Sequence, residues 1–286
     1  MSLAEDVHEK LINIDDMVVE NHVIQLRKDL SWDYDKYPNA LIAGGLGKTS
    51  LLFSLTAGLI KSGAIVDVAQ LGAYDWVPLG HTKALKYRVF YSQDKILRAL
   101  KRFTLEMRVR LNELRKLSVE HKNVGGTYVD YGLKPHFFVI DNLAPIMNIG
   151  DYKFATILTQ YMTEIELLGR SAGFQMIIGT TDPKADVLPS VIKQQTNFKV
   201  VLGFQADVYY NMALGFVPDF EDDQFNQILQ RQPYGVGVAY MNAPLGFVAP
   251  KIPDDFDMYG YFEELGEKYP VENAPGIKEL EALLGD

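Results

Sequence analysis

The segment 39–50 places an apolar strand directly before a glycine-rich turn and an apolar helix-like run. Glycines in such a turn let backbone N–H groups point at phosphate oxygens, and the following helix adds the partial positive charge of its N-terminus. A lysine then reaches the outer phosphates, and the next hydroxyl holds Mg²⁺. The pattern predicts a phosphate-binding loop formed by Gly44, Gly45, Gly47, Lys48, Thr49 and Ser50.

The spacing of this loop departs from the usual pattern G-x-x-x-x-G-K-[ST], which has a glycine where this chain has Ile42. The loop is therefore about two residues short. Two explanations lead to different functions: the loop has shrunk and its phosphate cradle is impaired, or the recorded sequence lacks residues of the natural one. A glycine turn that only caps a core helix is a third interpretation of this segment alone.

A second motif is the apolar run 136–141, which ends in Asp141, as expected for a central parallel strand with a carboxylate at its carboxyl end. This is a Walker B pattern, in which the aspartate supports Mg²⁺ and a following acid commonly polarises the attacking water. Here the following residue is Asn142, whose amide cannot accept a proton at neutral pH. Asp141 alone also fits an ordinary strand-end turn, but the Lys48 loop favours the Walker B interpretation.

Composition limits the class of protein. A chain of 286 residues that is 48% apolar can bury a large core and fits one sizeable α/β domain. The absence of cysteine excludes disulfides and thiolate metal sites, which suits a cytoplasmic protein. No apolar run of about 18 residues is present, so no membrane span is expected. The net charge of -9 argues against a large nucleic-acid surface, although a few basic loops can still contact DNA.

The order of elements indicates the fold class. Alternating apolar residues predict a hairpin over 17–30, followed by a turn region at 32–35. Buried strands are expected at 40–43, 65–69, 136–141, 174–180, 198–204 and 235–240. Helices are expected at 51–60, 92–122, 152–172, 188–194 and 277–284. Strands that alternate with helices predict an α/β fold with a mostly parallel sheet and right-handed crossovers. The basic side chains of the helix over 92–122 are interpreted as a solvated face.

Several of these segments together carry a resemblance to a known family. They are 32–45, Phe138 to Asp141, Gly169 to Phe174, Asp182-Pro183, 197–203, Gly235 to Gly237 and 253–257. In this order they resemble the motor domain of FtsK/SpoIIIE DNA translocases, and most of all the coupling ATPases of conjugative elements in Gram-positive bacteria. The resemblance covers roughly residues 17–257 and identifies the chain as a diverged member.

The resemblance implies a RecA-like P-loop NTPase, a homo-oligomeric ring of six subunits, ATP bound between neighbours, and double- or single-stranded DNA driven through the pore. By position, Lys48 would hold the β- and γ-phosphates, and Thr49 and Asp141 would hold Mg²⁺. Arg170 or Lys199 would face the nucleotide of a neighbour. DNA binding by the isolated chain is expected to be weak.

Departures from the family pattern fall at chemically active positions. Besides the short loop and Asn142, the glutamine that senses the γ-phosphate aligns with Thr181, and the usual Asp-Pro-Lys has become Gln70-Leu71-Gly72. We therefore keep two hypotheses open: an ATP-driven DNA translocase or conjugative coupling protein, and a non-hydrolysing scaffold subunit of the same family. An unrelated phosphate-loop enzyme such as a small-molecule kinase is disfavoured, because no compact lid or substrate-clamping arginine cluster is visible.

The expected domain organisation has three parts. Residues 1–36 combine a start typical of expression vectors with a short β segment, 37–257 form the motor domain, and 258–286 form an acidic tail. The family resemblance implies a cytoplasmic protein tethered to the inner face of the cell membrane by an upstream segment, with relaxosome or secretion-channel proteins as partners.

Overall fold

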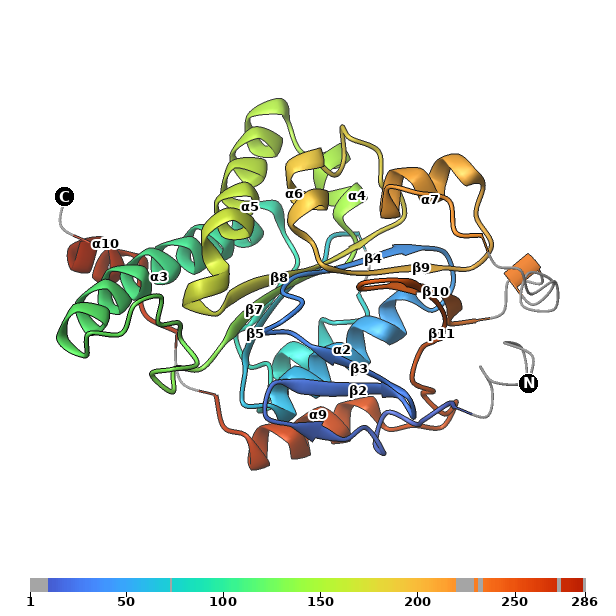
Figure 1. Ribbon diagram of the computed structural model, residues 1–286, viewed down its shortest axis with the longest axis horizontal. Coiled ribbons are helices and arrows are strands. Elements are labelled where there is room, and N and C mark those ends of the chain that lie inside the picture. Colours follow the sequence, from blue (N-terminus) through green and yellow to red (C-terminus); the bar gives the residue numbers. More distant parts are fainter. Residues whose placement is uncertain (1–9, 73, 220–228, 231–233, 272–273, 285–286) are drawn as a thin grey trace.

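The computed structural model of the protein describes residues 10–72, 74–219, 229–230, 234–271 and 274–284. Its centre is an eight-stranded sheet in the order β11-β10-β9-β4-β8-β7-β5-β6 (Figure 1). The strands are β4 (Ala40–Gly44), β5 (Ile65–Ala69), β6 (Val89–Phe90), β7 (His136–Ile140), β8 (Phe174–Thr180), β9 (Phe198–Leu202), β10 (Val236–Tyr240) and β11 (Pro244–Val248). The six strands from β4 to β9 are parallel, whereas β10 and β11 are antiparallel. The predicted α/β fold with a mostly parallel sheet is confirmed.

One face of this sheet is covered by α2 (Lys48–Lys61), α9 (Met258–Lys268) and a small sheet of β1 (Val19–Glu20), β2 (Val23–Arg27) and β3 (Leu30–Asp33) (Figure 1). The antiparallel pairing of β2 with β1 and with β3 confirms the predicted hairpin. The turn expected at 32–35 was placed too early, because Trp32 lies in β3 and is fully buried. Its indole Nε1 donates to the Tyr37 carbonyl at 2.8 Å and its ring stacks on Phe198. Trp32 therefore fastens the small sheet to the large one.

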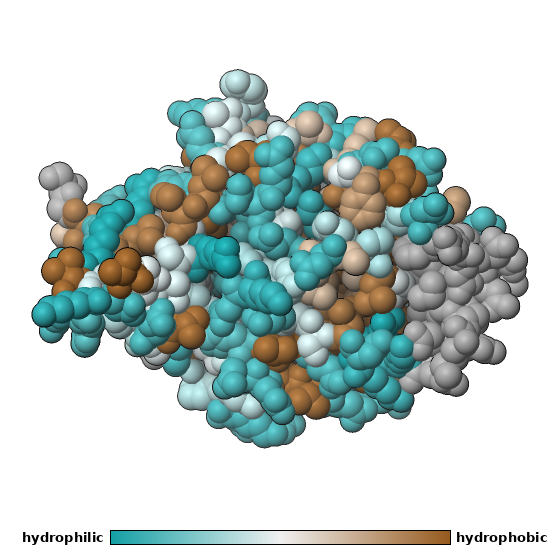
Figure 2. All heavy atoms as spheres, viewed as in Figure 1, coloured by the Kyte–Doolittle hydropathy of each residue, from teal (hydrophilic) through white to brown (hydrophobic). Residues whose placement is uncertain are grey.

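The opposite face carries α3 (Gln93–Glu120), α4 (Leu143–Ile149), α5 (Tyr152–Ala172), α6 (Ser190–Gln195) and α7 (Asp207–Leu214) (Figure 1). Figure 2 shows hydrophilic residues over most of the visible surface, with apolar ones in small groups, as is normal for a folded domain. Within the described residues, no helix combines the length and the apolar character that crossing a bilayer requires.

The described residues of the segment 258–286, which was expected to be an acidic tail, contribute to the fold. In α9, Phe262 and Leu265 are buried in the core beside α2. After 271, α10 (Ile277–Leu284) lies along α3, where Lys101 Nζ binds Glu281 at 2.7 Å. The short terminal helix expected there is confirmed.

The basic face of α3 is less solvated than its sequence indicates. Arg108 forms an ion pair with Glu164 of α5 at 2.6 Å. Arg102 is mostly buried and binds Asp67 of β5, also at 2.6 Å. The interpretation as a solvated face is therefore wrong for Arg102, which joins α3 to the sheet. Arg108 stays exposed while it joins α3 to α5.

A buried carboxyl group lies on α5. Glu166 Oε2 accepts a hydrogen bond from Asn39 Nδ2 at 2.6 Å, and Glu166 Oε1 is buried without a hydrogen-bond partner. Burial raises the pKa of Glu166 well above its ordinary value. The folded protein therefore binds this proton more tightly than the unfolded chain does.

We expect Glu166→Gln to flatten the pH dependence of stability. A carboxyl group whose pKa is raised by folding stabilises the protein at pH values below its pKa in the unfolded chain. This stabilisation is lost as the pH rises towards its pKa in the folded protein. Wild type should lose about 1 kcal/mol of unfolding free energy per pH unit just above pH 5, and the neutral amide should not. Urea unfolding at pH 5, 6 and 7 measures this, with the exposed Glu113→Gln as control. Parallel pH profiles for wild type and Glu166→Gln would contradict it.

Candidate nucleotide-binding site

The glycine turn lies at the carboxyl end of β4, between the end of β9 and residue 235. Gly44 has φ of 107°, and a Cβ placed there would lie 2.2 Å from the Leu202 carbonyl oxygen. Gly47 has φ of 95°, and its Cβ would lie 2.6 Å from Cα of Gly235. Only glycine fits such a backbone and such close contacts. The backbone at Leu202 and the backbone at Gly235 therefore hold the loop in this conformation from two sides.

The part of the turn between these two glycines is open. Gly45 and Leu46 are exposed, and a Cβ at Gly45 would meet no atom within 4 Å. α2 begins at Lys48, and the N–H groups of its first turn have no acceptor within the helix. The open side and the helix N-terminus together suit an anion such as phosphate.

The lysine of the motif is the first residue of α2 and extends over β8. Lys48 is only 8% exposed, and its side chain crosses β8, where a Cβ at Gly179 would lie 3.7 Å from Lys48 Cδ. That same Cβ would lie 3.0 Å from the carbonyl oxygen of Ile140, the residue before Asp141. Within the described residues, Lys48 Nζ makes no hydrogen bond or ion pair. An ammonium group held over the sheet without a partner is available to a phosphate.

The aspartate of the second motif is also at the strand ends. Asp141 follows β7, is nearly buried, and accepts a hydrogen bond at Oδ2 from Trp76 Nε1 at 2.9 Å. Trp76 lies in the connection between β5 and β6 and packs on Phe53 of α2, with ring centroids 4.4 Å apart. The indole thereby orients the carboxylate and leaves Oδ1 without a hydrogen bond from any described residue.

Asn142 and Thr181 form a reciprocal pair. Asn142 Nδ2 donates to Thr181 Oγ1 at 3.0 Å, and Thr181 N donates to Asn142 Oδ1 at 3.1 Å. Asn142 Oδ1 also caps α4 by accepting from Ala144 N. Asn142 and Thr181, which both depart from the family pattern, thus bind each other. Both Nδ2 and Oδ1 of the Asn142 amide are engaged in hydrogen bonds.

Two tyrosines that the sequence did not single out contact the loop. Tyr209 of α7 donates from its hydroxyl to the Thr181 carbonyl at 3.2 Å, and burial raises its pKa to about 12 although the Gly44 N–H partly opposes the shift. Tyr234 shares a hydrogen bond with the hydroxyl of Ser50, and next to it Gly235 N donates to the Leu46 carbonyl at 3.3 Å. Both contacts join segments far apart in sequence, so no local pattern indicates them.

Arg170 and Lys199 lie away from the loop of their own chain. Arg170 is exposed near the end of α5, where a Cβ at Gly169 would lie 2.0 Å from the Phe174 carbonyl oxygen at the start of β8. It therefore lies at the amino edge of the parallel strands, opposite Lys48. Lys199 is opposite Leu41 in the β4–β9 ladder, three positions before the Leu202 that pairs with Gly44. Burial, and to a lesser extent Lys193, lowers the pKa of Lys199.

The residues present fit a magnesium-bound nucleoside triphosphate. Lys48 and the α2 N-terminus, which have no side-chain partner among the described residues, suit phosphate oxygens. The open side of Gly45 lets phosphates approach the backbone closely. Thr49 and Asp141 offer the hydroxyl and carboxylate oxygens that Mg²⁺ prefers when phosphates and water complete its coordination. When bound, Mg²⁺ would neutralise charge on the outer phosphates.

Comparison with known proteins identifies a relative of this chain. Over 259 residues, or 89% of this chain, the sequence is 32% identical to the Ftsk domain-containing protein YdcQ of Bacillus subtilis strain 168. The chain carries an FtsK-type domain. It spans about half (52%) of the length of that relative. No family model matches the sequence.

Solved structures share the fold of this FtsK-type domain. The pCW3 conjugation coupling protein TcpA, solved as a monomer with ATPγS, superposes with a TM-score of 0.67 at 18% identity, over 90% of this chain and 73% of TcpA. ATPases 2 and 3 of EssC from Geobacillus thermodenitrificans give 0.68 at 17% identity, over 91% of this chain and 51% of EssC. At this identity the likeness establishes the P-loop ATPase fold, and the activity is a separate question.

Proposed function

We propose that this FtsK-type domain binds ATP with Mg²⁺ and serves as a subunit of a DNA-translocating or conjugative coupling machine. The observation that carries the proposal is the convergence of Lys48 and Asp141. The Lys48 side chain passes over Gly179 beside the carbonyl of Ile140, directly before the aspartate. Its ammonium has no hydrogen-bond or ion-pair partner among the described residues. TcpA, which shares the fold, is a conjugation coupling protein and was solved with ATPγS.

In this proposal each group has a defined part. The N-terminus of α2 and Lys48 neutralise phosphate oxygens, and Thr49 and Asp141 supply oxygens to Mg²⁺. Trp76 acts as a positioning residue, because its indole fixes the carboxylate of Asp141 through Oδ2. Ser50 joins the loop to Tyr234.

A second candidate is a non-hydrolysing scaffold subunit of the same family, favoured by the Asn142–Thr181 pair. Hydrolysis requires a group that accepts a proton from the attacking water or orients that water. Both polar atoms of the Asn142 amide are already engaged with Thr181 and α4, and an amide is no base. A scaffold subunit can be nucleotide-binding or nucleotide-free, and it differs from the motor in that it does not turn over ATP.

We expect slow hydrolysis even with saturating ATP. The rate should fall well below the roughly 1 to 100 per second of many phosphoryl-transfer enzymes. Phosphate release by the wild type tests this expectation, measured without DNA, with duplex DNA and with single-stranded DNA. The same measurement on Lys48→Ala gives the background rate. Asn142→Glu should raise the rate if the rest of the site is competent. A wild-type rate within that range would disprove the expectation, and DNA stimulation of the rate would favour the motor over the scaffold.

The assembly is part of the proposal. A homo-oligomeric ring, six-membered by family resemblance, would bring Arg170 or Lys199 of one subunit to the nucleotide of its neighbour. Both residues lie away from the loop of their own chain, and Arg170 is exposed. Relaxosome or secretion-channel proteins, and a tether to the inner face of the cell membrane, are proposed on the same basis.

A further inference from the structure

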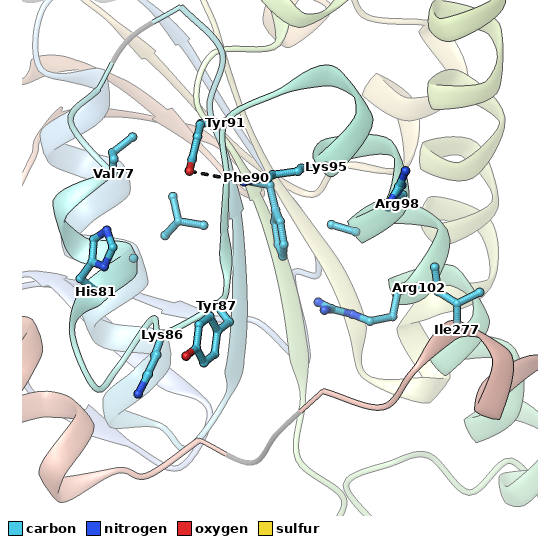
Figure 3. A pocket seen from close by; sticks show the side chains of 13 residues that line it. Val77, His81, Lys86, Tyr87, Phe90, Tyr91, Lys95, Arg98, Arg102 and Ile277 are labelled. Atoms are coloured by element: carbon cyan, nitrogen blue, oxygen red, sulfur yellow. Dashed lines mark hydrogen bonds between the residues drawn. The ribbon is translucent and has the colours of Figure 1, made fainter.

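A basic groove opens at the β6 edge of the sheet, at the far end from β11. Its main cavity, of about 480 Å³, lies between η1 (Pro78–His81), β6 and the first turns of α3 (Figure 3). A second cavity, of about 620 Å³, shares Lys86, Tyr87 and Arg102 with it. We call this depression the β6 groove. The basic residues that line its main cavity are His81, Lys86, Lys95, Arg98 and Arg102.

The charge of the β6 groove is opposite to that of the whole chain. No acidic residue lines either cavity within the described part of the chain. Arg98 is balanced by Asp94 at 3.0 Å, and Arg102 by Asp67. Lys86 and Lys95 have no carboxylate within 4.0 Å among the described residues. The groove thus keeps free positive charge on a chain of net charge -9.

Aromatic rings alternate with these charges. Figure 3 shows Tyr91 and Tyr87 towards opposite ends of the main cavity, with Phe90 between them. Lys95 Nζ lies 4.5 Å from the ring centroid of Tyr91, and Lys86 Nζ lies 5.3 Å from that of Tyr87. Lys95 Nζ also donates a hydrogen bond to the Tyr91 hydroxyl at 3.4 Å. Each of these two lysines therefore lies beside a partly or largely exposed ring.

Tyr87 is held in an unusual way. Its φ is 65°, in the left-handed region that bulky residues rarely adopt, and its side chain is 79% exposed. Such backbone strain, costing on the order of 1–3 kcal/mol, occurs preferentially at ligand sites. No packing in the core explains why a large ring is presented here.

We propose that the β6 groove binds a single nucleic-acid strand. Exposed rings let unstacked bases stack, and interspersed lysines meet the phosphates between them, which is the chemistry of single-strand binding sites. A duplex keeps its bases paired and stacked, and so offers only phosphates to Lys86 and Lys95. A mononucleotide offers one base and one phosphate group to a groove with two tyrosine–lysine pairs.

The experiment uses the full chain with a fluorescent 20-nucleotide oligothymidine, in buffer with EDTA and no ATP. Binding is followed by anisotropy across a salt series. Because nucleotide and Mg²⁺ are absent, failure of the ATP site leaves the result unchanged. Lys86→Glu/Lys95→Glu should weaken binding at least tenfold and reduce the salt slope by about 1.4, as expected for two lost phosphate contacts to a single strand. The double exchange Lys116→Glu/Lys153→Glu, on exposed surface elsewhere, is the matched control.

Tyr87→Gly separates the role of the ring from folding. Glycine accepts the left-handed backbone, so thermal stability should be kept, whereas loss of one stacked base should weaken binding about tenfold. Tyr152→Ala, which removes a ring that is 88% exposed, should have no effect on binding. The proposal is overturned by no binding at low salt, by equal losses in the control variants, by tighter binding of a duplex, or by competition from thymidine monophosphate at equal phosphate concentration.

Discussion

Replacing Lys48 with alanine is expected to weaken binding of ATP–Mg²⁺ about 100-fold, the largest functional effect of any single substitution in this chain. The ammonium is nearly buried, unpaired among the described residues, and fixed over β8 by the first turn of α2. Charge-assisted hydrogen bonds to phosphate are among the strong ones, and no neighbouring cation is placed to substitute for Lys48 among the site residues described.

Titration calorimetry with ATP and MgCl₂ measures this effect, with Lys116→Ala as control for the loss of one exposed charge. The fold of Lys48→Ala should survive, because the substitution removes no hydrogen bond or ion pair among the described residues. Equal affinities of wild type and Lys48→Ala would eliminate the loop as a nucleotide site. ATP binding that does not depend on Mg²⁺ would instead contradict the proposal that Thr49 and Asp141 hold the metal ion.

Long periodic elements were predictable from the sequence. Strand β5 and helix α5 have the predicted bounds, because apolar runs and helical stripes reflect burial directly. β6 has two residues and β11 begins with Pro244, so neither provides enough pattern to read. α9 contains Gly260 and Gly266, which weaken a helix prediction. Gly266 is needed there, because a Cβ would lie 2.1 Å from the backbone nitrogen of Ala84.

The candidate site, like the fold, was only partly predictable from the sequence. The two motifs fixed the positions of Lys48 and Asp141, because a loop after one parallel strand and an acid after another must meet at one edge of the sheet. No local sequence pattern indicates the contacts that support the lysine loop and the aspartate. Trp76 is 65 positions from Asp141 in sequence, and Tyr234 is 184 positions from Ser50. Tertiary packing alone brings such pairs together.

Gly44→Ala is expected to lower the free energy of unfolding by about 3 kcal/mol. The loss has two causes: alanine disfavours the left-handed backbone, and its Cβ overpacks against a backbone oxygen. A Cβ at Gly44 would lie 2.2 Å from the Leu202 carbonyl, and an oxygen of the central sheet cannot retreat without breaking the β4–β9 ladder. Urea unfolding with linear extrapolation measures the loss.

Gly45→Ala is the matched control, one residue away in the same loop. Its added Cβ would meet nothing within 4 Å, so its unfolding free energy should stay within about 0.5 kcal/mol of wild type. The same methyl group occupies the open side of the turn, where we place the phosphates. Gly45→Ala should therefore weaken ATP–Mg²⁺ binding while Gly44→Ala weakens the fold. If Gly45→Ala keeps full affinity, the phosphates do not approach this face of the loop; if Gly44→Ala is as stable as Gly45→Ala, the contact with Leu202 does not constrain the loop.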